Sequence, residues 1–196
     1  MSLPQPLSPR LGRLRDRLAG HLPVTGGDDE SLRWAAVSVV LVPSPEAILL
    51  IRRAERPGDP WSGHMALPGG RREPIDTDLV ATAVRETFEE VGLTLSQAEL
   101  LGRLDDIIPR TPVLPPIAVR PYVFSLPERL PLVPNSEVAA THWVHLDRLL
   151  HPETYHSVRL EIRGERRIVP AYQLDDAIVW GMTERILSAL LEHLRT

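Results

Sequence analysis

Three carboxylates stand close together in one stretch of the chain, at Glu86, Glu89 and Glu90, directly after Arg85. If this stretch is helical, residues three and four apart are neighbours, so the three carboxylates lie along one side of the helix. The i, i+4 pair of Glu86 and Glu90 repels by about 0.2–0.5 kcal/mol unless something neutralises it. A divalent cation such as Mg²⁺, which takes oxygen ligands and shares them with phosphates, would reverse that sign. The spacing suits a metal site. The alternative is a solvated acidic face with an Arg85–Glu89 ion pair, which is the more common use of such a charge run.

The residues around the carboxylates indicate the elements that must position them. A helical pattern runs from about Thr77 to Val91, with Asp76 or Thr77 available as its cap and Gly92 where a helix commonly ends. Before it, the short apolar run 65–67 leads into Pro68-Gly69-Gly70. The sequence thus predicts a loop, a short strand and a tight turn ahead of its best-defined helix.

The rest of the chain alternates short β-like runs with turns. The first two runs, 34–42 and 47–52, are rich in valine, isoleucine and leucine and form a hairpin. The later runs are 100–105, 117–125, 141–145, 156–162 and 167–172. A short helical turn is predicted at Leu146–Leu150, and an amphipathic helix at Ile178–Leu194 closes the chain.

An additional amphipathic helix is predicted near the N-terminus. Ser8-Pro9 opens it, and the turn-rich linker 25–29 follows it, so we expect it to be peripheral. The predicted organisation is an N-terminal helix and linker over residues 1–32, followed by one catalytic domain over residues 33–196.

The composition excludes several classes of protein. Hydrophobic residues make up 43% and charged residues 24%, as in ordinary globular proteins, and a formal net charge of −4 without basic runs argues against nucleic acid as a partner. The absence of cysteine and lysine removes thiolate ligands, a Walker A lysine and Schiff-base chemistry. No stretch of about 18 apolar residues or signal-peptide core occurs, so we expect a cytoplasmic protein without a membrane partner. A homodimer is left open.

The segment from Leu67 to Leu93 resembles the box of the Nudix hydrolases, Gx5Ex7REUxEExGU, in which U is a bulky aliphatic residue. Matches in identity and spacing are Arg85-Glu86, Glu89-Glu90, Gly92 and Leu93. With Gly70 in the glycine position, Asp76 takes the glutamate position, one extra residue precedes Arg85, and Thr87 replaces the aliphatic residue.

This resemblance implies an α/β fold, an α/β/α sandwich around a mixed β-sheet, and a metal-dependent diphosphatase. The implied ligands of Mg²⁺ or Mn²⁺ are Glu86, Glu89, Glu90 and a carbonyl of Gly70 or Gly69. Arg85 would orient a glutamate, and Glu89 or Glu90 would act as the base.

One further acid lies downstream of the box. Glu137 is similar to an acid that several Nudix families use as an additional ligand or base. The alternative is a surface glutamate that opens a strand.

Outside the box, residues from about Trp34 to Leu194 most resemble the coenzyme A diphosphatase branch. The residues that carry this resemblance are Leu49-Leu50, Arg53-Ala54, Gly63, Pro68-Gly69-Gly70 and the closing run 179–183, whereas Ile51, Asp59 and Leu67 depart from the branch's motif. The implied substrate is a small nucleoside diphosphate linked to another moiety, with coenzyme A or a derivative first. ADP-ribose, a dinucleotide, or a catalytically silent nucleotide sensor are the alternatives.

Substrate-binding candidates lie just before the glycine turn. The guanidinium groups of Arg52, Arg53 and Arg56 can grip phosphates, including the 3′-phosphate that coenzyme A carries and ADP-ribose lacks. His64 lies beside the expected metal loop, and Trp61 could stack on a base. The alternatives are a solvated strand end for the arginines and structural packing for His64 and Trp61.

Overall fold

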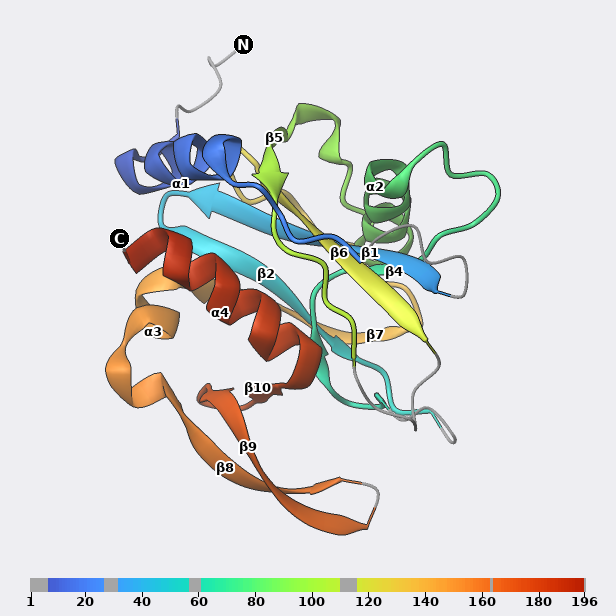
Figure 1. Ribbon diagram of the computed structural model, residues 1–196, viewed down its shortest axis with the longest axis vertical. Helices are drawn as coiled ribbons and strands as arrows, with labels where there is room; N and C mark the ends of the chain where they lie inside the picture. The colour runs from blue at the N-terminus through green and yellow to red at the C-terminus, as the bar shows by residue number, and fades with distance from the viewer. Residues whose placement is uncertain (1–6, 27–31, 57–60, 110–115, 163, 196) are drawn as a thin grey trace.

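The computed structural model describes residues 7–26, 32–56, 61–109, 116–162 and 164–195 (Figure 1). Its elements in chain order are α1 (Pro9–Gly20), β1 (Arg33–Pro43), β2 (Glu46–Arg53), β3 (Met65–Ala66), β4 (Gly69–Arg71), α2 (Leu79–Val91), η1 (Leu95–Gln97), β5 (Glu99–Arg103), β6 (Ile117–Ser125), β7 (Val138–His145), α3 (Leu146–Leu150), η2 (Pro152–Thr154), β8 (Tyr155–Ile162), β9 (Glu165–Gln173), β10 (Ile178–Trp180) and α4 (Gly181–Arg195).

The main sheet is mixed, as the resemblance implies. Its strands follow the order β3-β2-β1-β6-β5, with β4 paired to β1 and β7 paired to β2. The predicted β1–β2 hairpin is antiparallel, with Leu41 opposite Ile48, whereas β1 and β6 run parallel, with Val39 opposite Val123. A smaller sheet, β10-β9-β8, ends in a hairpin that extends away from the body (Figure 1).

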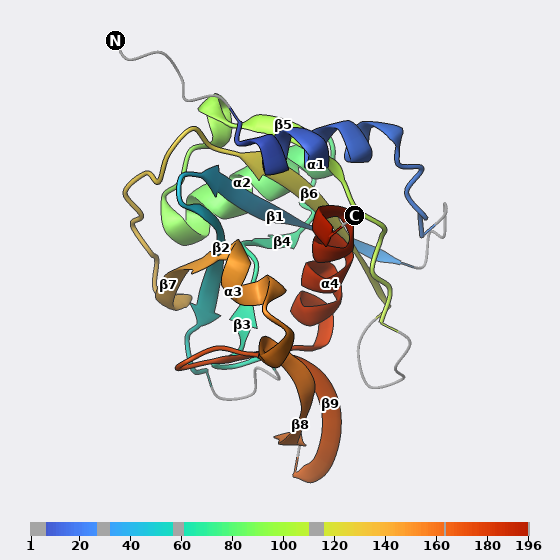
Figure 2. The ribbon, with the colours of Figure 1, turned by 90° about the vertical axis from the view of Figure 1, so that its left-hand side faces the viewer.

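The main sheet lies between two layers of helices, which confirms the predicted sandwich. Successive side chains of a strand point to opposite faces. On one face Ala36 and Val40 of β1 pack in a cluster with Ala83 of α2, and on the other Val39 packs in a cluster with Leu187 of α4. Figure 2 shows α2 on one side of β1 and β6, and α1 and α4 on the other.

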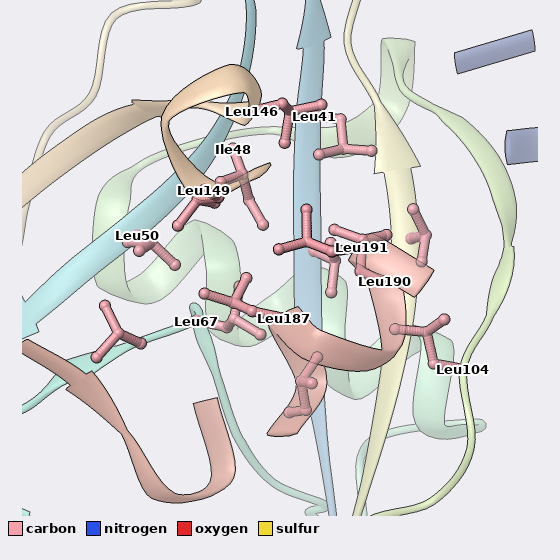
Figure 3. Packing of buried hydrophobic residues seen from close by; sticks show 14 of the residues in the cluster. Leu41, Ile48, Leu50, Leu67, Leu104, Leu146, Leu149, Leu187, Leu190 and Leu191 are labelled. Carbon is pink, nitrogen blue, oxygen red and sulfur yellow. The ribbon is translucent and has the colours of Figure 1, made fainter. Parts of the chain in front are cut away.

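Leucines dominate the larger of the two cores. Leu187, Leu190 and Leu191 of α4 face Leu41 and Leu50 of the central hairpin (Figure 3). All five side chains are fully buried, so this face of the sheet is closed to solvent. None of the helices in the described part of the chain is long and apolar enough to cross a membrane.

The prediction that the N-terminal helix is peripheral is wrong. Leu11, Leu14 and Leu18 of α1 are buried in the same core as the leucines of α4. They recur at helical spacing and therefore form one apolar face, which α1 must cover by packing. The cap is as predicted, because the Ser8 hydroxyl accepts a hydrogen bond from the Leu11 N–H at 3.2 Å. Of the predicted linker, residues 27–29 lie outside the described residues.

The closing helix begins three residues later than its apolar pattern suggests. Ile178–Trp180 forms β10, in which Val179 lies opposite Tyr172 of β9. Gly181 then has a φ of 72°, a left-handed conformation that favours glycine and separates the strand from the helix. Residues 178–180, which the apolar pattern assigned to the helix, therefore form a strand because they pair with β9.

A pair of histidines joins the first and last helices. The rings of His21 and His193 meet edge to face with centroids 4.9 Å apart, and His21 Nε2 lies 2.9 Å from Asp105 Oδ1. Burial lowers the pKa of His193, and the neighbouring His21 and Arg17 lower it further, against the opposing charges of Asp105 and Glu192.

We predict that this contact makes stability depend on pH. Because the folded pKa of His193 lies below its ordinary value of about 6.5, the unfolded chain binds more protons as the pH falls through that value. His193→Gln should therefore flatten the decrease in Tm between about pH 7.5 and about pH 5.5. The exposed His145→Gln is the control. Parallel Tm profiles for the wild type and His193→Gln would contradict this prediction.

Candidate active site

Helix α2 carries the acidic cluster, and its two ends are fixed by local side-chain and backbone chemistry. The Asp78 carboxylate accepts a hydrogen bond from the Ala81 N–H at 2.8 Å, and Gly92 ends the helix in a left-handed conformation with a φ of 65°. Gly92 is thus confirmed as the C-terminal residue. The N-cap is Asp78, whereas the sequence predicted Asp76 or Thr77. Asp76 cannot cap the helix because its carboxylate binds Arg85.

Asp76 holds Arg85 through two parallel hydrogen bonds. Arg85 Nε lies 2.9 Å from Asp76 Oδ1, and a terminal nitrogen lies 2.9 Å from Oδ2. The Asp76 side chain is only 3% exposed and also accepts hydrogen bonds from the Thr82 hydroxyl and the Glu73 N–H. These contacts, the Arg85 guanidinium first, hold the pKa of Asp76 well below its usual range. The carboxylate is therefore a fixed, ionised anchor.

Arg85 in turn orients two of the predicted metal ligands. Its second terminal nitrogen donates to Glu86 Oε1 at 3.1 Å and to Glu89 Oε2 at 2.9 Å. Arg85 therefore lies between Asp76 on one side and Glu86 and Glu89 on the other, in contact with the glutamates that it was predicted to orient. Sequence reasoning missed the anchoring part that Asp76 takes, although its position in the box was the available signal.

The glycine turn lies directly against the carboxylates of α2. Gly69 N–H donates to Glu90 Oε2 at 2.9 Å, and a Cβ placed on Gly70 would come within 2.4 Å of the Glu86 carboxyl group. Gly69 has a φ of 150°, and a Cβ there would lie 2.3 Å from the Ala36 carbonyl oxygen. Only glycine fits at position 69, and a side chain at position 70 would displace the Glu86 carboxylate, so loop backbone and carboxylates come into contact.

Glu90 is more deeply buried than Glu86 and Glu89. The residue is 4% exposed, and this burial raises its pKa to about 7, against the hydrogen bond from Gly69. Burial likewise raises the pKa of Glu86. A buried carboxylate is costly without a compensating positive charge.

The threonine that departs from the box is accounted for by its surroundings. Thr87 is fully buried, and its hydroxyl lies 2.7 Å from that of Ser38 in β1. Both hydroxyls reach the Ala83 carbonyl oxygen. A hydrogen-bonded polar pair thus replaces the aliphatic contact between helix and sheet.

The downstream acid Glu137 lies in the turn directly before β7. It pairs with Arg56, whose terminal nitrogen lies 2.9 Å from Glu137 Oε1. The charges of Arg53 and Glu137 both act on Glu90, the first favouring its ionised form and the second opposing it. Glu137 therefore precedes a strand and lies within electrostatic range of the acidic cluster.

The remaining substrate-binding candidates line a cleft of about 750 Å³ next to the cluster. Arg52 and Arg53 form part of it, and a terminal nitrogen of Arg52 donates to the Asp176 carbonyl oxygen at 2.7 Å. The His64 ring meets the Trp180 ring edge to face at 4.7 Å. Arg56 is outside this lining, and Asp59 lies outside the described residues.

Comparison with known proteins accounts for this arrangement. Residues 32–162 match the family model of the NUDIX domain. The chain belongs to the Nudix hydrolase family. It is 32% identical over 164 residues to the uncharacterized Nudix hydrolase NudL of Photorhabdus laumondii, covering 83% of this chain and 86% of the relative. NudL of Yersinia pestis is 30% identical, with 82% and 79% covered.

A solved structure shows the same fold. A MutT/nudix family protein from Enterococcus faecalis superposes with a TM-score of 0.56 at 22% identity, covering 94% of this chain and 74% of the other. The likeness extends beyond the residues of the domain match. The likeness therefore shows the shared fold over nearly the whole chain.

Nudix hydrolases generally use divalent metal ions, and the donor set here is suitable for one. Carboxylate and carbonyl oxygens are the ligands that Mg²⁺ and Mn²⁺ prefer. Within the described residues, no group of three or more acidic or histidine side chains is arranged to hold a metal ion. Arg85 donates to Glu86 and Glu89, and Glu90 accepts a hydrogen bond from Gly69. Mg²⁺ usually takes only one or two carboxylates plus substrate phosphates, so these carboxylates fit the ion by their chemistry.

We predict that removing the Asp76 anchor weakens both the fold and the site. Asp76→Ala leaves Arg85 without its buried partner and should cost about 3 kcal/mol in the free energy of unfolding, measured by urea denaturation. The kcat should fall as well, because Glu86 and Glu89 lose their orientation. The exposed neighbour Glu73→Ala, which keeps its backbone N–H, is the matched control. Equal stability of Asp76→Ala and Glu73→Ala would contradict the anchoring role.

Proposed function

We propose that this Nudix hydrolase cleaves the diphosphate bond of a nucleoside diphosphate linked to another moiety, in a metal-dependent reaction. Coenzyme A or a derivative is the first candidate, and ADP-ribose or a dinucleotide offers the same bond. The observation that carries the proposal is the contact of Glu86 and Glu90 with the backbone of Gly69 and Gly70. It gathers oxygen donors beside a backbone that a phosphate group can approach closely.

The ligands of Mg²⁺ or Mn²⁺ in this proposal are Glu86, Glu89, Glu90 and the Gly70 carbonyl. A bound divalent cation neutralises charge on the phosphoryl oxygens and makes water a better nucleophile. The water oxygen bonds to one phosphorus, the bridging P–O bond breaks, and two phosphomonoesters leave. Glu89 or Glu90 would take the proton of that water. The hydrogen bonds of Arg85 to Glu86 and Glu89 support its role in orienting them.

Arg53 is placed to bind the diphosphate itself. Its charge acts on Glu90, and its side chain lines the adjoining cleft, so it spans the acidic cluster and the cleft. Its N–H donates to the His64 carbonyl, and the next residue, Ala54, donates to the Glu137 carbonyl. The strand end that carries Arg53 is thus tied to both flanking segments. A guanidinium held here suits a phosphate oxygen of the scissile diphosphate.

We predict that Glu89→Gln and Glu90→Gln each lower kcat by about 10²-fold or more, because a neutral amide holds a cation and accepts a proton poorly. The fold should remain, since an amide oxygen can still accept the Gly69 hydrogen bond. Addition of Mg²⁺ should raise the Tm of the wild type and raise that of Glu90→Gln much less. The exposed Glu99→Gln in β5 is the control.

Two outcomes separate this function from its rivals. Full activity in both variants would refute the assignment of the acidic cluster. Mg²⁺-dependent nucleotide binding by the wild type without any turnover would instead indicate a silent nucleotide sensor.

The position of Arg53 also predicts how it affects substrate choice. If Arg53 binds the diphosphate, Arg53→Ala should lower kcat/KM equally for coenzyme A and for dephospho-coenzyme A. The loss of transition-state stabilisation should be about 1.5–3 kcal/mol for each substrate. The exposed Arg13→Ala on α1 is the control. A loss confined to coenzyme A would instead assign Arg53 to the 3′-phosphate.

A further inference from the structure

The closing motif 179–183 takes no part in the chemistry proposed above, yet three of its residues have fixed structural tasks. Val179 is fully buried in the larger core. Gly181 supplies the left-handed turn into α4, and the Thr183 hydroxyl donates to the Met65 carbonyl oxygen at 3.1 Å. The Thr183 hydrogen bond attaches the start of α4 to β3. Trp180, which lies between Val179 and Gly181, lines the cleft.

Trp180 and His64 stand together on the wall of this cleft. Their rings meet edge to face at 4.7 Å, so the indole is oriented by a neighbour from a segment more than 100 residues earlier. The turn between β9 and β10 lies beside it, closed by a hydrogen bond from the Leu174 N–H to the Ala177 carbonyl at 2.8 Å. Arg52 ties this turn to β2 through the Asp176 carbonyl. These contacts join the walls of the cleft to one another.

The cleft lies beside the acidic cluster. Met65 of its lining stands four residues before Gly69, whose N–H donates to Glu90. Arg53 of its lining lies opposite Val138, the residue after Glu137. Ala139, two residues after Glu137, contributes as well. A diphosphate held at the carboxylates would consequently direct one of its two substituents into the cleft.

The lining indicates what that substituent must be. Glu55 and Asp176 balance Arg52 and Arg53 in the lining, and Asp175 is paired with Arg148 at 2.8 Å, so the cleft offers no surplus of positive charge. Asp176 also lies 3.5 Å from Arg52, which partly neutralises that cation. A further anionic group would meet no excess of cations here, and burying such a group needs a charge partner.

Much of the remaining lining is apolar. It comes from Met65, Leu174, Ile178 and Trp180, with the amide of Gln173 among them. Apolar and aromatic walls with a few polar groups are typical of small-molecule sites, and a volume of about 750 Å³ lies within their usual range. An uncharged arm with apolar and amide groups fits these properties.

We propose that the cleft between β3 and the β9–β10 turn binds the uncharged arm of the substrate beyond the diphosphate, and that Trp180 determines which arms are accepted. This inference rests on the proposed diphosphatase function, which places the diphosphate at the carboxylates. It assigns the closing motif to substrate specificity and locates any additional phosphate of the substrate outside this cleft.

Binding of a free arm tests the proposal without catalysis. Pantetheine, the uncharged arm of coenzyme A without its phosphates, is titrated into metal-free protein by calorimetry. Trp180→Ala should weaken its binding about tenfold, and Trp180→Phe should retain most of it. Ile168→Ala, an exposed apolar position on the β8–β9 hairpin, is the control and should bind as the wild type does. Equal affinity of the wild type and Trp180→Ala, or no binding to either, overturns the proposal.

Steady-state kinetics distinguish a lost arm site from a damaged enzyme. Trp180→Ala should raise KM for coenzyme A about tenfold with little change in kcat, the sign of lost uniform binding. The methyl ester of ADP has the same diphosphate without an arm, and its kcat/KM should not change. Equal losses on both substrates overturn the arm site while leaving the diphosphatase function intact. Failure of the wild type to hydrolyse either compound removes coenzyme A as its substrate, and the calorimetric titration still decides the cleft.

Discussion

The close approach of α2 to the glycine turn is the constraint on which the rest of the site depends. At Gly70 a methyl group would overlap the Glu86 carboxylate, and at Gly69 it would overlap the backbone of β1. Because neither side chain exists, the turn pairs with β1 while Glu90 reaches the Gly69 N–H. The packing of α2 on the sheet offsets the electrostatic repulsion between Glu86 and Glu90. That packing also supplies the rigid support that a catalytic group needs.

The Asp76–Arg85 pair converts this contact into an ordered site. A single buried carboxylate fixes the guanidinium from one side, and the guanidinium holds two glutamates from the other. The extra residue between Asp76 and Arg85 belongs to this geometry, since Asp76 lies ahead of the helix and Asp78 takes over its cap. The shorter aspartate is thus no sign of a damaged box. Its two oxygens make the two parallel hydrogen bonds that the arginine requires.

Local features of this protein were predictable from sequence, and long-range ones were not. The helix carrying Arg85 and its end at Gly92 follow from spacing and from glycine chemistry. The burial of α1 depends on α4, whose sequence is more than 160 residues away, so an amphipathic pattern could not place it. Ile178 and Val179 suit a strand or a helix face equally, and only their pairing with β9 decides. The cleft combines the end of β2 with the β9–β10 turn, a contact that no local pattern contains.

The proposed function depends on which bond this protein cleaves. Phosphorus-31 NMR of the products, formed from coenzyme A, ADP-ribose and a diadenosine diphosphate with Mg²⁺ present, identifies that bond directly. We expect at least one of these substrates to give two phosphomonoesters, and a chelator to stop the reaction. Cleavage of none of the three, release of orthophosphate from the 3′-phosphate of coenzyme A alone, or undiminished turnover with the chelator present would contradict the proposed function.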